Sequence, residues 1–166
     1  MANVHIFCLG FFVMSTDISP EQTIILAKIR HIEELERLDT CIQFVESIGQ
    51  MVHHMQTERG ASSLYLASAG KRFAAERAEI ISQNLELEAR FRQALTQHLN
   101  QNARADAKQL TLIAWILLGL DQQTLLRHQI TLQKISVTDC MESCSRRIAS
   151  LISLIFEISD SSVHNI

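Results

Sequence analysis

The amino-acid sequence predicts an all-α protein, an antiparallel helical bundle of four to five long amphipathic helices. One proline and five glycines in 166 residues are too few for a turn-rich β protein, but they suit long helices joined by short links. Apolar residues recur at helical spacing along most of the chain, and no strand-like alternation competes with them. We therefore expect residues 19–161 to form a single domain.

The first helix is predicted to begin at the segment SPEQ, residues 19–22. Serine followed three residues later by glutamine is a capping box, and proline is favoured in a first helical turn. Apolar residues at helical spacing then continue over residues 24–66, as one very long helix or as two helices broken near Gly49 or Gly60. Gly70 is expected to close this segment, because glycine readily adopts the left-handed conformation that ends helices.

Two further helical segments come next. A second helix is expected over residues 71–100, where apolar residues stand seven apart. After a short polar link, a third helix should begin near Arg104. This helix either continues to Lys134 or kinks at Gly119.

The last helix carries the most regular repeat in the chain. Ser136 with Asp139 three residues later marks its start. Its apolar positions then alternate by three and four residues, which predicts one buried stripe on a single helix. These positions are Val137, Met141, Cys144, Ile148, Leu151, Ile155 and Ile158.

Short segments flank the predicted domain at both ends. Residues 1–18 form an apolar N-terminal extension, whose longest apolar run is too short to span a bilayer. We expect this extension to be dispensable and translation to begin at Met14, where a polar segment starts. Residues 162–166 are interpreted as a tail.

Composition limits the classes of function. A net charge of −3 and a pI near 6.1 give no electrostatic indication of nucleic-acid binding. The four cysteines lack the spacing of secreted disulfide proteins and fit a reducing compartment, so we expect a cytoplasmic protein without stable membrane insertion. Cys140 and Cys144 are interpreted as buried thiols in preference to metal ligands. No metal, haem, phosphate-loop or nucleophile motif is present, so neither an enzyme nor a cofactor is expected.

Two arginines occupy positions where the helical repeat calls for apolar residues. Arg59 lies seven residues after Val52, and Arg127 lies seven residues after Leu120. A guanidinium stays charged and is costly to bury without a partner. One interpretation pairs each arginine with a buried glutamate or places it at a frayed helix end. Glu58 is unsuited to Arg59, because adjacent residues on a helix point in different directions.

The other interpretation is a site for a small anion. Two guanidinium groups that face a common point can each hold a planar oxyanion through paired hydrogen bonds. Gly60 would allow the close approach of a backbone, and Ser62 would offer a hydroxyl donor. The candidate ligand-binding residues are therefore Arg59, Arg127, Gly60 and Ser62.

The segment MVHHMQTERGASSLYL, residues 51–66, resembles the motif LVHELQxERGxSxxYL of the NIT family of nitrate- and nitrite-sensing domains. The later segments LLRHQITLQKIS, residues 125–136, and residues 138–159 are similar to the family's LRxxI segment and terminal helix. A Tyr-Thr pair is common in that terminal helix, and Ser145 and Arg146 stand in its place. The resemblance implies a helical sensor of nitrate or nitrite, with Arg59 and, less directly, Arg127 as ligand contacts.

The sequence also departs from the family pattern. The stretch between the two arginine motifs is shorter than is usual, which implies a reduced bundle, and no output module follows. We therefore expect a sensor that signals by altered helix packing to a separate protein partner, with a homodimer as one arrangement. The alternative is a helical interaction or dimerisation module of the same fold that binds no ligand.

Overall fold

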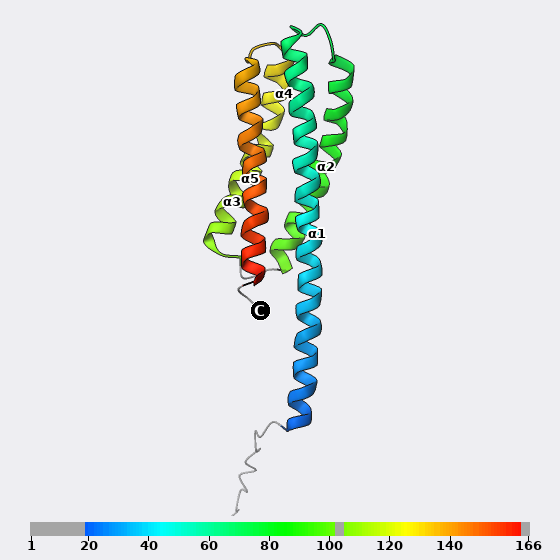
Figure 1. Ribbon diagram of the computed structural model, residues 1–166, viewed down its shortest axis with the longest axis vertical. Coiled ribbons are helices and arrows are strands. Elements are labelled where there is room, and N and C mark those ends of the chain that lie inside the picture. The colour runs from blue at the N-terminus through cyan, green and yellow to red at the C-terminus, as the bar shows by residue number, and fades with distance from the viewer. Residues whose placement is uncertain (1–18, 102–104, 164–166) are drawn as a thin grey trace, which may run out of the picture. The chain divides into compact units, whose positions relative to one another are not determined.

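The computed structural model describes residues 19–101 and 105–163, and every regular element in these ranges is a helix. The all-α prediction is confirmed. The proposed extension over residues 1–18 and the proposed start at Met14 lie outside the described residues. The helices, labelled in Figure 1, are α1 (Pro20–Ala67), α2 (Ala74–Gln101), α3 (Ala107–Asp121), α4 (Gln123–Thr131) and α5 (Val137–Val163).

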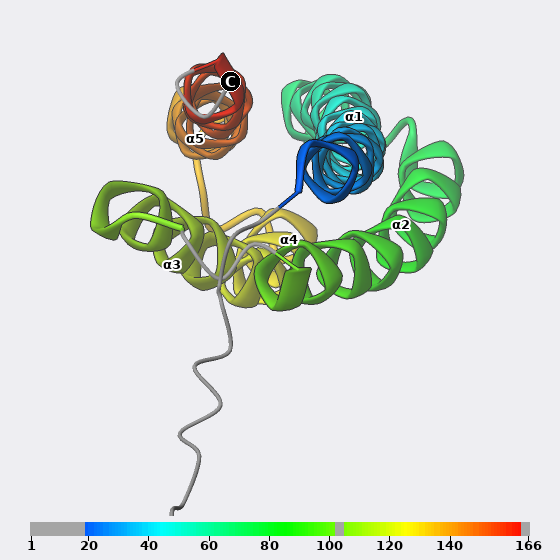
Figure 2. The same ribbon diagram turned by 90° about the horizontal axis from the view of Figure 1, so that it is seen from below.

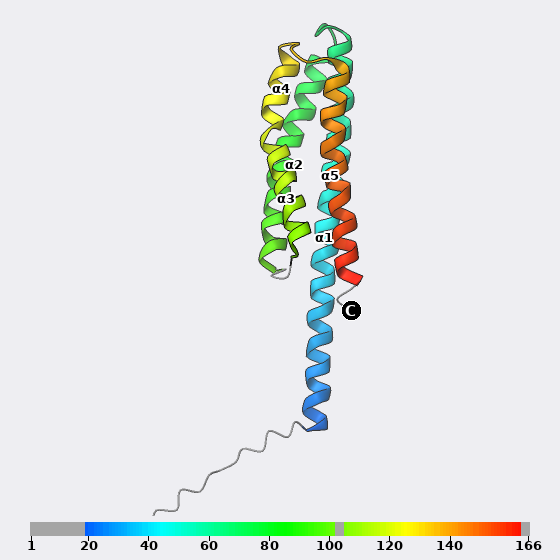
Figure 3. The same ribbon diagram turned by 90° about the vertical axis from the view of Figure 1, so that its left-hand side faces the viewer.

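The described residues from 36 onward form one compact unit, and residues 19–35 belong to another. Within the described part of the larger unit, α1, α2, the α3–α4 pair and α5 run in alternately opposite directions (Figures 1 and 3). The end-on view in Figure 2 places them around a common interior. Because α3 and α4 follow one another along the same edge, they share one position, and the unit is an antiparallel bundle with four helical positions.

The predicted caps of α1 are present. At its start, Gln22 N donates to Ser19 Oγ over 3.2 Å and Ser19 N donates to Gln22 Oε1 over 3.1 Å. The helix passes through Gly49 and Gly60 without a break. At its end, Gly70 N donates to the carbonyl of Tyr65 and Ala69 N donates to that of Leu66, which is a Schellman motif. Ala69, with φ 53°, therefore occupies the left-handed position that glycine prefers.

The boundary between α3 and α4 lies at Gln122. Asp106 caps α3 by accepting a hydrogen bond of 2.7 Å from Gln109 N. The expected alternatives were a continuous helix or a kink at Gly119, but Gly119 lies inside α3 and the break comes three residues later. The predicted cap of α5 is confirmed, since Asp139 N donates to Ser136 Oγ over 3.0 Å.

The apolar interior is built mainly from one face of each helix. On α1, however, the heptad series that leads to Arg59 flanks this interior: Leu38 is 43% exposed and Val45 and Val52 are only partly buried. Heptad positions drift around a straight helix by about 20° per repeat, so a neighbouring line of residues faces the core. The main cluster comprises Phe44, Ile48, Met51, Met55, Phe91, Leu95, Ile113, Ile116, Leu120, Ile148, Leu151, Leu154 and Ile158.

None of the helices in the described ranges is both long and apolar enough to cross a membrane.

Replacing Ala69 by glycine is expected to raise the free energy of unfolding by about 1 kcal/mol, because a left-handed residue with a Cβ is strained by roughly that amount. Chemical denaturation of the purified protein measures the change. Ala67→Gly, two residues earlier and still inside α1, should lower stability by up to about 1 kcal/mol. A loss of stability in Ala69→Gly would contradict the left-handed cap.

Candidate functional site

A buried glutamate lies at the centre of the bundle's polar contacts. Glu58 is 2% exposed, on the face of α1 that also buries Met51, Met55 and Ser62. The spacing of these four residues by four, three and four keeps them on one side of the helix. The helical spacing that buries Met51 and Met55 therefore also places the carboxylate of Glu58 in the interior of the bundle.

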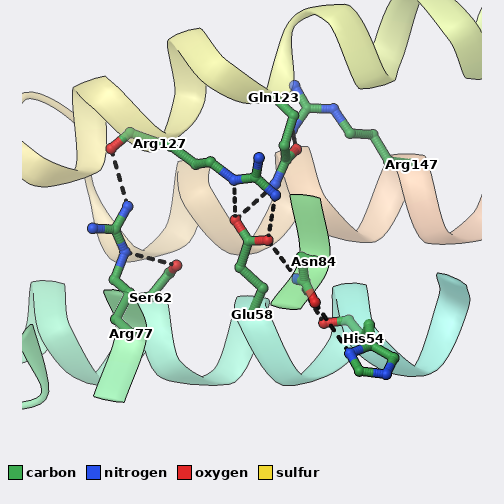
Figure 4. Close-up of polar contacts among 8 residues, drawn as sticks. All are labelled: His54, Glu58, Ser62, Arg77, Asn84, Gln123, Arg127 and Arg147. Atoms are coloured by element: carbon green, nitrogen blue, oxygen red, sulfur yellow. Dashed lines mark hydrogen bonds and ion pairs between the residues drawn. The ribbon is translucent and has the colours of Figure 1, made fainter. Parts of the chain in front are cut away.

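Glu58 accepts hydrogen bonds from three residues on two other helices (Figure 4). Arg127 donates twice, from Nε to Oε1 over 2.8 Å and from Nη2 to Oε2 over 2.7 Å, in the paired geometry that suits a carboxylate. Asn84 Nδ2 donates to Oε2 over 2.6 Å, and Gln123 Nε2 donates to Oε1 over 3.0 Å. The carboxylate thereby connects α1 to α2 and α4.

These contacts determine the charge state of the pair. Burial alone would raise the pKa of Glu58, but the hydrogen bonds and charge of Arg127, with the amides of Asn84 and Gln123, lower it below its ordinary value of 4.5. Burial likewise disfavours the charged form of Arg127, and Glu58 more than compensates, so the pKa of Arg127 is raised. Both groups are therefore ionised at neutral pH.

Arg77, on α2, is a second buried guanidinium and is 6% exposed. It donates to Ser62 Oγ over 3.2 Å, to Thr131 Oγ1 over 3.1 Å and to the backbone carbonyl of Arg127 over 3.0 Å. All three acceptors are neutral, and burial lowers the pKa of Arg77. This cation is thus held by dipoles, without an ion pair to any described carboxylate.

Two partly buried arginines lie beside this network. Arg147, on α5, donates from Nη1 to Gln123 Oε1 over 2.6 Å, and burial lowers its pKa. Arg59, on α1, donates from Nη1 to Ser145 Oγ over 2.9 Å, across to α5. Neither forms an ion pair with a carboxylate among the described residues, so Glu58, which is paired with Arg127, is the one described carboxylate in the network.

The four ligand-binding residues expected from the sequence lie in different surroundings in the structure. Arg127 and Ser62 both belong to the buried network, and Arg77 bridges them by donating to each. Arg59 lies at its edge and shares no hydrogen-bond partner with Arg127 in the described chain. Gly60 faces solvent, with no atom within 4 Å of the point where a side chain would begin.

Sequence reasoning missed Glu58, Asn84 and Arg77. On α2 the buried line consists of residues seven apart, and it was obscured because three of its four members are polar. Arg77 and Asn84 could have been found by searching α2 for polar residues seven apart, since polar residues buried inside a bundle must meet hydrogen-bond partners. That line is Arg77, Asn84, Phe91 and His98.

Cys140 and Cys144 are both buried, in a small apolar cluster with Leu66, Leu126 and Ile130. The hydrogen bond with Cys140, together with burial, raises the pKa of the Cys144 thiol, so it stays protonated. Among residues 19–101 and 105–163, no three His, Cys, Asp or Glu side chains gather closely enough to hold a metal ion. The burial of both side chains in the apolar cluster fits the interpretation of the two cysteines as packed thiols.

Because the folded-state pKa of Glu58 is lowered, its ionised form stabilises the fold above pH 4.5, and this contribution is lost as pH falls through the lowered value. Glu58→Gln should cost about 3 kcal/mol at pH 7, since it leaves Arg127 buried without its counter-charge. The difference in unfolding free energy between the two proteins should shrink as pH falls below 4.5. Urea denaturation at a series of pH values tests this, and a constant difference would show that Glu58 is not the titrating group.

Comparison with known proteins agrees with the resemblance of the ERG segment. A profile of the family described as nitrate and nitrite sensing, NIT, matches residues 50–165. The solved structure of the NasR transcription antiterminator is similar, with a TM-score of 0.73 and 28% sequence identity over 86% of this chain and 39% of that one. This chain therefore spans less than half of the antiterminator's length. No curated protein matches the sequence. Because the family profile covers more than half of the chain, the chain belongs to the NIT family of nitrate- and nitrite-sensing domains.

Proposed function

We propose that this chain is a sensor domain that binds a nitrate or nitrite ion through arginine side chains of its helical bundle, with Arg59 and Arg127 as the principal contacts. Family membership supplies the class of ligand. The observation in this chain that supports it is an excess of positive charge. Four guanidinium groups lie in or beside the network, and among the described residues only one of them, that of Arg127, is paired with a carboxylate. The other three, of Arg59, Arg77 and Arg147, donate to neutral acceptors.

Several donors of these arginines remain available to an oxyanion. Glu58 takes Nε and Nη2 of Arg127, and no described residue accepts from its Nη1. Arg59 uses only Nη1, toward Ser145, which leaves Nε and Nη2. Guanidinium edges match planar oxyanions in shape as well as in charge, so a small ion with oxygens in one plane suits them. Ser62 is the proposed hydroxyl of the site, because it lies inside the network beside Arg77. Gly60, the remaining candidate, faces solvent on the opposite side of α1.

Binding of the ion would be coupled to helix packing. Without an anion, the excess positive charge in the interior opposes close packing of the helices that carry it. An ion held between Arg59 on α1 and Arg127 on α4 favours the arrangement in which these two helices approach, so it shifts the population toward that packing. The ion thereby changes the surface that the bundle presents.

We propose that this change is read by a separate protein or by a second copy of the chain. Within residues 20–35, six large apolar side chains are each roughly half exposed, and such side chains favour a protein contact. They are Ile24, Ile25, Leu26, Ile29, Ile32 and Leu35.

Nitrate has few atoms, which limits its affinity. At the ceiling of about −1.5 kcal/mol per heavy atom, its four heavy atoms give roughly −6 kcal/mol, a dissociation constant of tens of micromolar. At ~10 mM nitrate, binding at this affinity stabilises the folded state by about 3 kcal/mol. For a domain of this size, that corresponds to a rise in melting temperature of roughly 6–12 °C.

A thermal-shift titration with sodium nitrate against sodium chloride at matched ionic strength tests the proposal. We expect a saturable rise with nitrate or nitrite alone. Arg59→Ala and Arg127→Ala should each weaken binding by about 1.5–3 kcal/mol, because each removes charge-assisted hydrogen bonds.

Arg90→Ala is the matched control, since Arg90 lies on the exposed face of α2 beside Glu86 and outside the network. It should titrate like the parent protein. A response to nitrate no larger than the response to chloride would contradict the sensor and leave an interaction module of the same fold.

Glu58→Gln is expected to tighten nitrate binding, although it destabilises the ligand-free protein. The substitution replaces the carboxylate that competes for Arg127 by a neutral amide, whose NH2 group cannot accept, and so frees one further donor for the ion. Isothermal titration calorimetry with the parent and variant measures the difference. Weaker binding by the variant would mean that Glu58 positions Arg127 for the ion.

A further inference from the structure

A second feature lies beside the Glu58 network and shares Arg147 with its edge, on the side of the bundle between α3 and α5. It is a pocket of about 390 Å³, within the range of small-molecule sites and far larger than a nitrate ion needs. Met55 of α1 closes its inner end together with Leu120 and Leu151, which are buried. The pocket is therefore an opening from the surface toward the apolar core.

The two walls of this pocket differ in chemistry. The α3 wall is apolar, with Trp115, Ile116 and Leu118. The α5 wall carries Ser143, Arg146, Arg147 and Ser150. Trp115 is 63% exposed and Leu118 is 46% exposed, so both offer apolar surface to a ligand.

The charge on the α5 wall is largely uncompensated. Arg147 makes one hydrogen bond, from Nη1 to the neutral Gln123, so its Nε and Nη2 have no acceptor in the described chain. Arg146 is paired with Glu142 over 3.3 Å, but both side chains are about two-thirds exposed and such a pair is weak in water. A carboxylate in the pocket would thus meet one unpaired guanidinium and one that is readily recruited.

We infer that the α3–α5 pocket is a second ligand site, which takes a small organic monocarboxylate with an aromatic or branched apolar body. Its carboxylate contacts Arg147, with Arg146 beside it, and its body lies against Trp115 and Leu118. A neighbouring groove shares Trp115, but the single cation among its described lining residues, Lys108, is already paired with Glu157, and Asp160 adds a second carboxylate there. Neither of the principal contacts proposed for nitrate, Arg59 and Arg127, lines this pocket.

The chain supplies its own reporter, because Trp115 is the single tryptophan. Hydrocinnamate is a suitable probe, with hydrocinnamyl alcohol as its neutral counterpart and acetate as its head group alone. At constant ionic strength, hydrocinnamate should change Trp115 fluorescence saturably, with a dissociation constant on the order of a millimolar. The alcohol and acetate should each bind at least roughly tenfold more weakly than hydrocinnamate.

Variants locate the probe. Arg147→Gln should weaken hydrocinnamate binding roughly tenfold or more, and Ser150→Leu, which fills the pocket without touching Gln123, should do the same. Arg90→Gln is the exposed-arginine control, and melting curves of every variant establish that it is folded. Arg59→Ala should leave hydrocinnamate binding unchanged even where it abolishes the response to nitrate.

Three results would overturn the inference. If hydrocinnamyl alcohol bound as tightly as hydrocinnamate, the pocket would recognise only the apolar body of the ligand and not its carboxylate. Binding that is insensitive to both Arg147→Gln and Ser150→Leu would place the probe in the neighbouring groove. Loss of hydrocinnamate binding in Arg59→Ala, to the same extent as in Arg147→Gln, would show that the pocket and the proposed nitrate site are one.

Discussion

The ion pair between Glu58 and Arg127 is the interaction on which the rest of the bundle's interior depends. A buried carboxylate without compensation would be protonated or would unfold its surroundings, whereas here it accepts four hydrogen bonds. Those bonds come from α2 and α4, and α5 is joined through the contact between Gln123 and Arg147. One side chain of α1 therefore determines how the other helices are placed around the core.

The network is also unbalanced, and this imbalance links structure to sensing. A core designed for stability alone would match each buried cation with an anion or replace both by apolar residues. Here Arg77 is held by neutral oxygens and by the ring of Tyr65, and Arg59 and Arg147 reach neutral acceptors at the edge. In the proposed sensor, the remaining positive charge costs stability in the free protein, and this cost is recovered when an anion binds. Such an interior would respond to its ligand without a hinge or lid.

The sequence predicted the helices well because their signals are local. The caps of α1 and α5 and the glycine turn that closes α1 depend on residues within one or two turns, and the structure has them. The heptad lines were less exact, since Leu38 of the first predicted line and Met141 of the last are exposed. The site was harder to predict because it depends on register between helices. Arg59 and Glu58 differ by about 100° around α1. The heptad spacing predicted that the side of α1 carrying Arg59 would face the core, but in the folded bundle the side carrying Glu58 is the one that is buried. Partners such as Asn84, which lies on another helix, could not be paired from one sequence.

A single-base change at the codon for Gln123 would alter the charge of the network. The amide of Gln123 is polarised at both ends, with Oε1 accepting from Arg147 and Nε2 donating to Glu58. Glutamine and glutamate codons differ by one base, and glutamate at this position would place a permanent negative charge among the arginines while turning a donor toward Glu58 into a repelling oxygen. Such an allele would imitate an occupied site. A selection for signalling in the absence of ligand should therefore return substitutions at position 123, far more often than at the exposed positions around it.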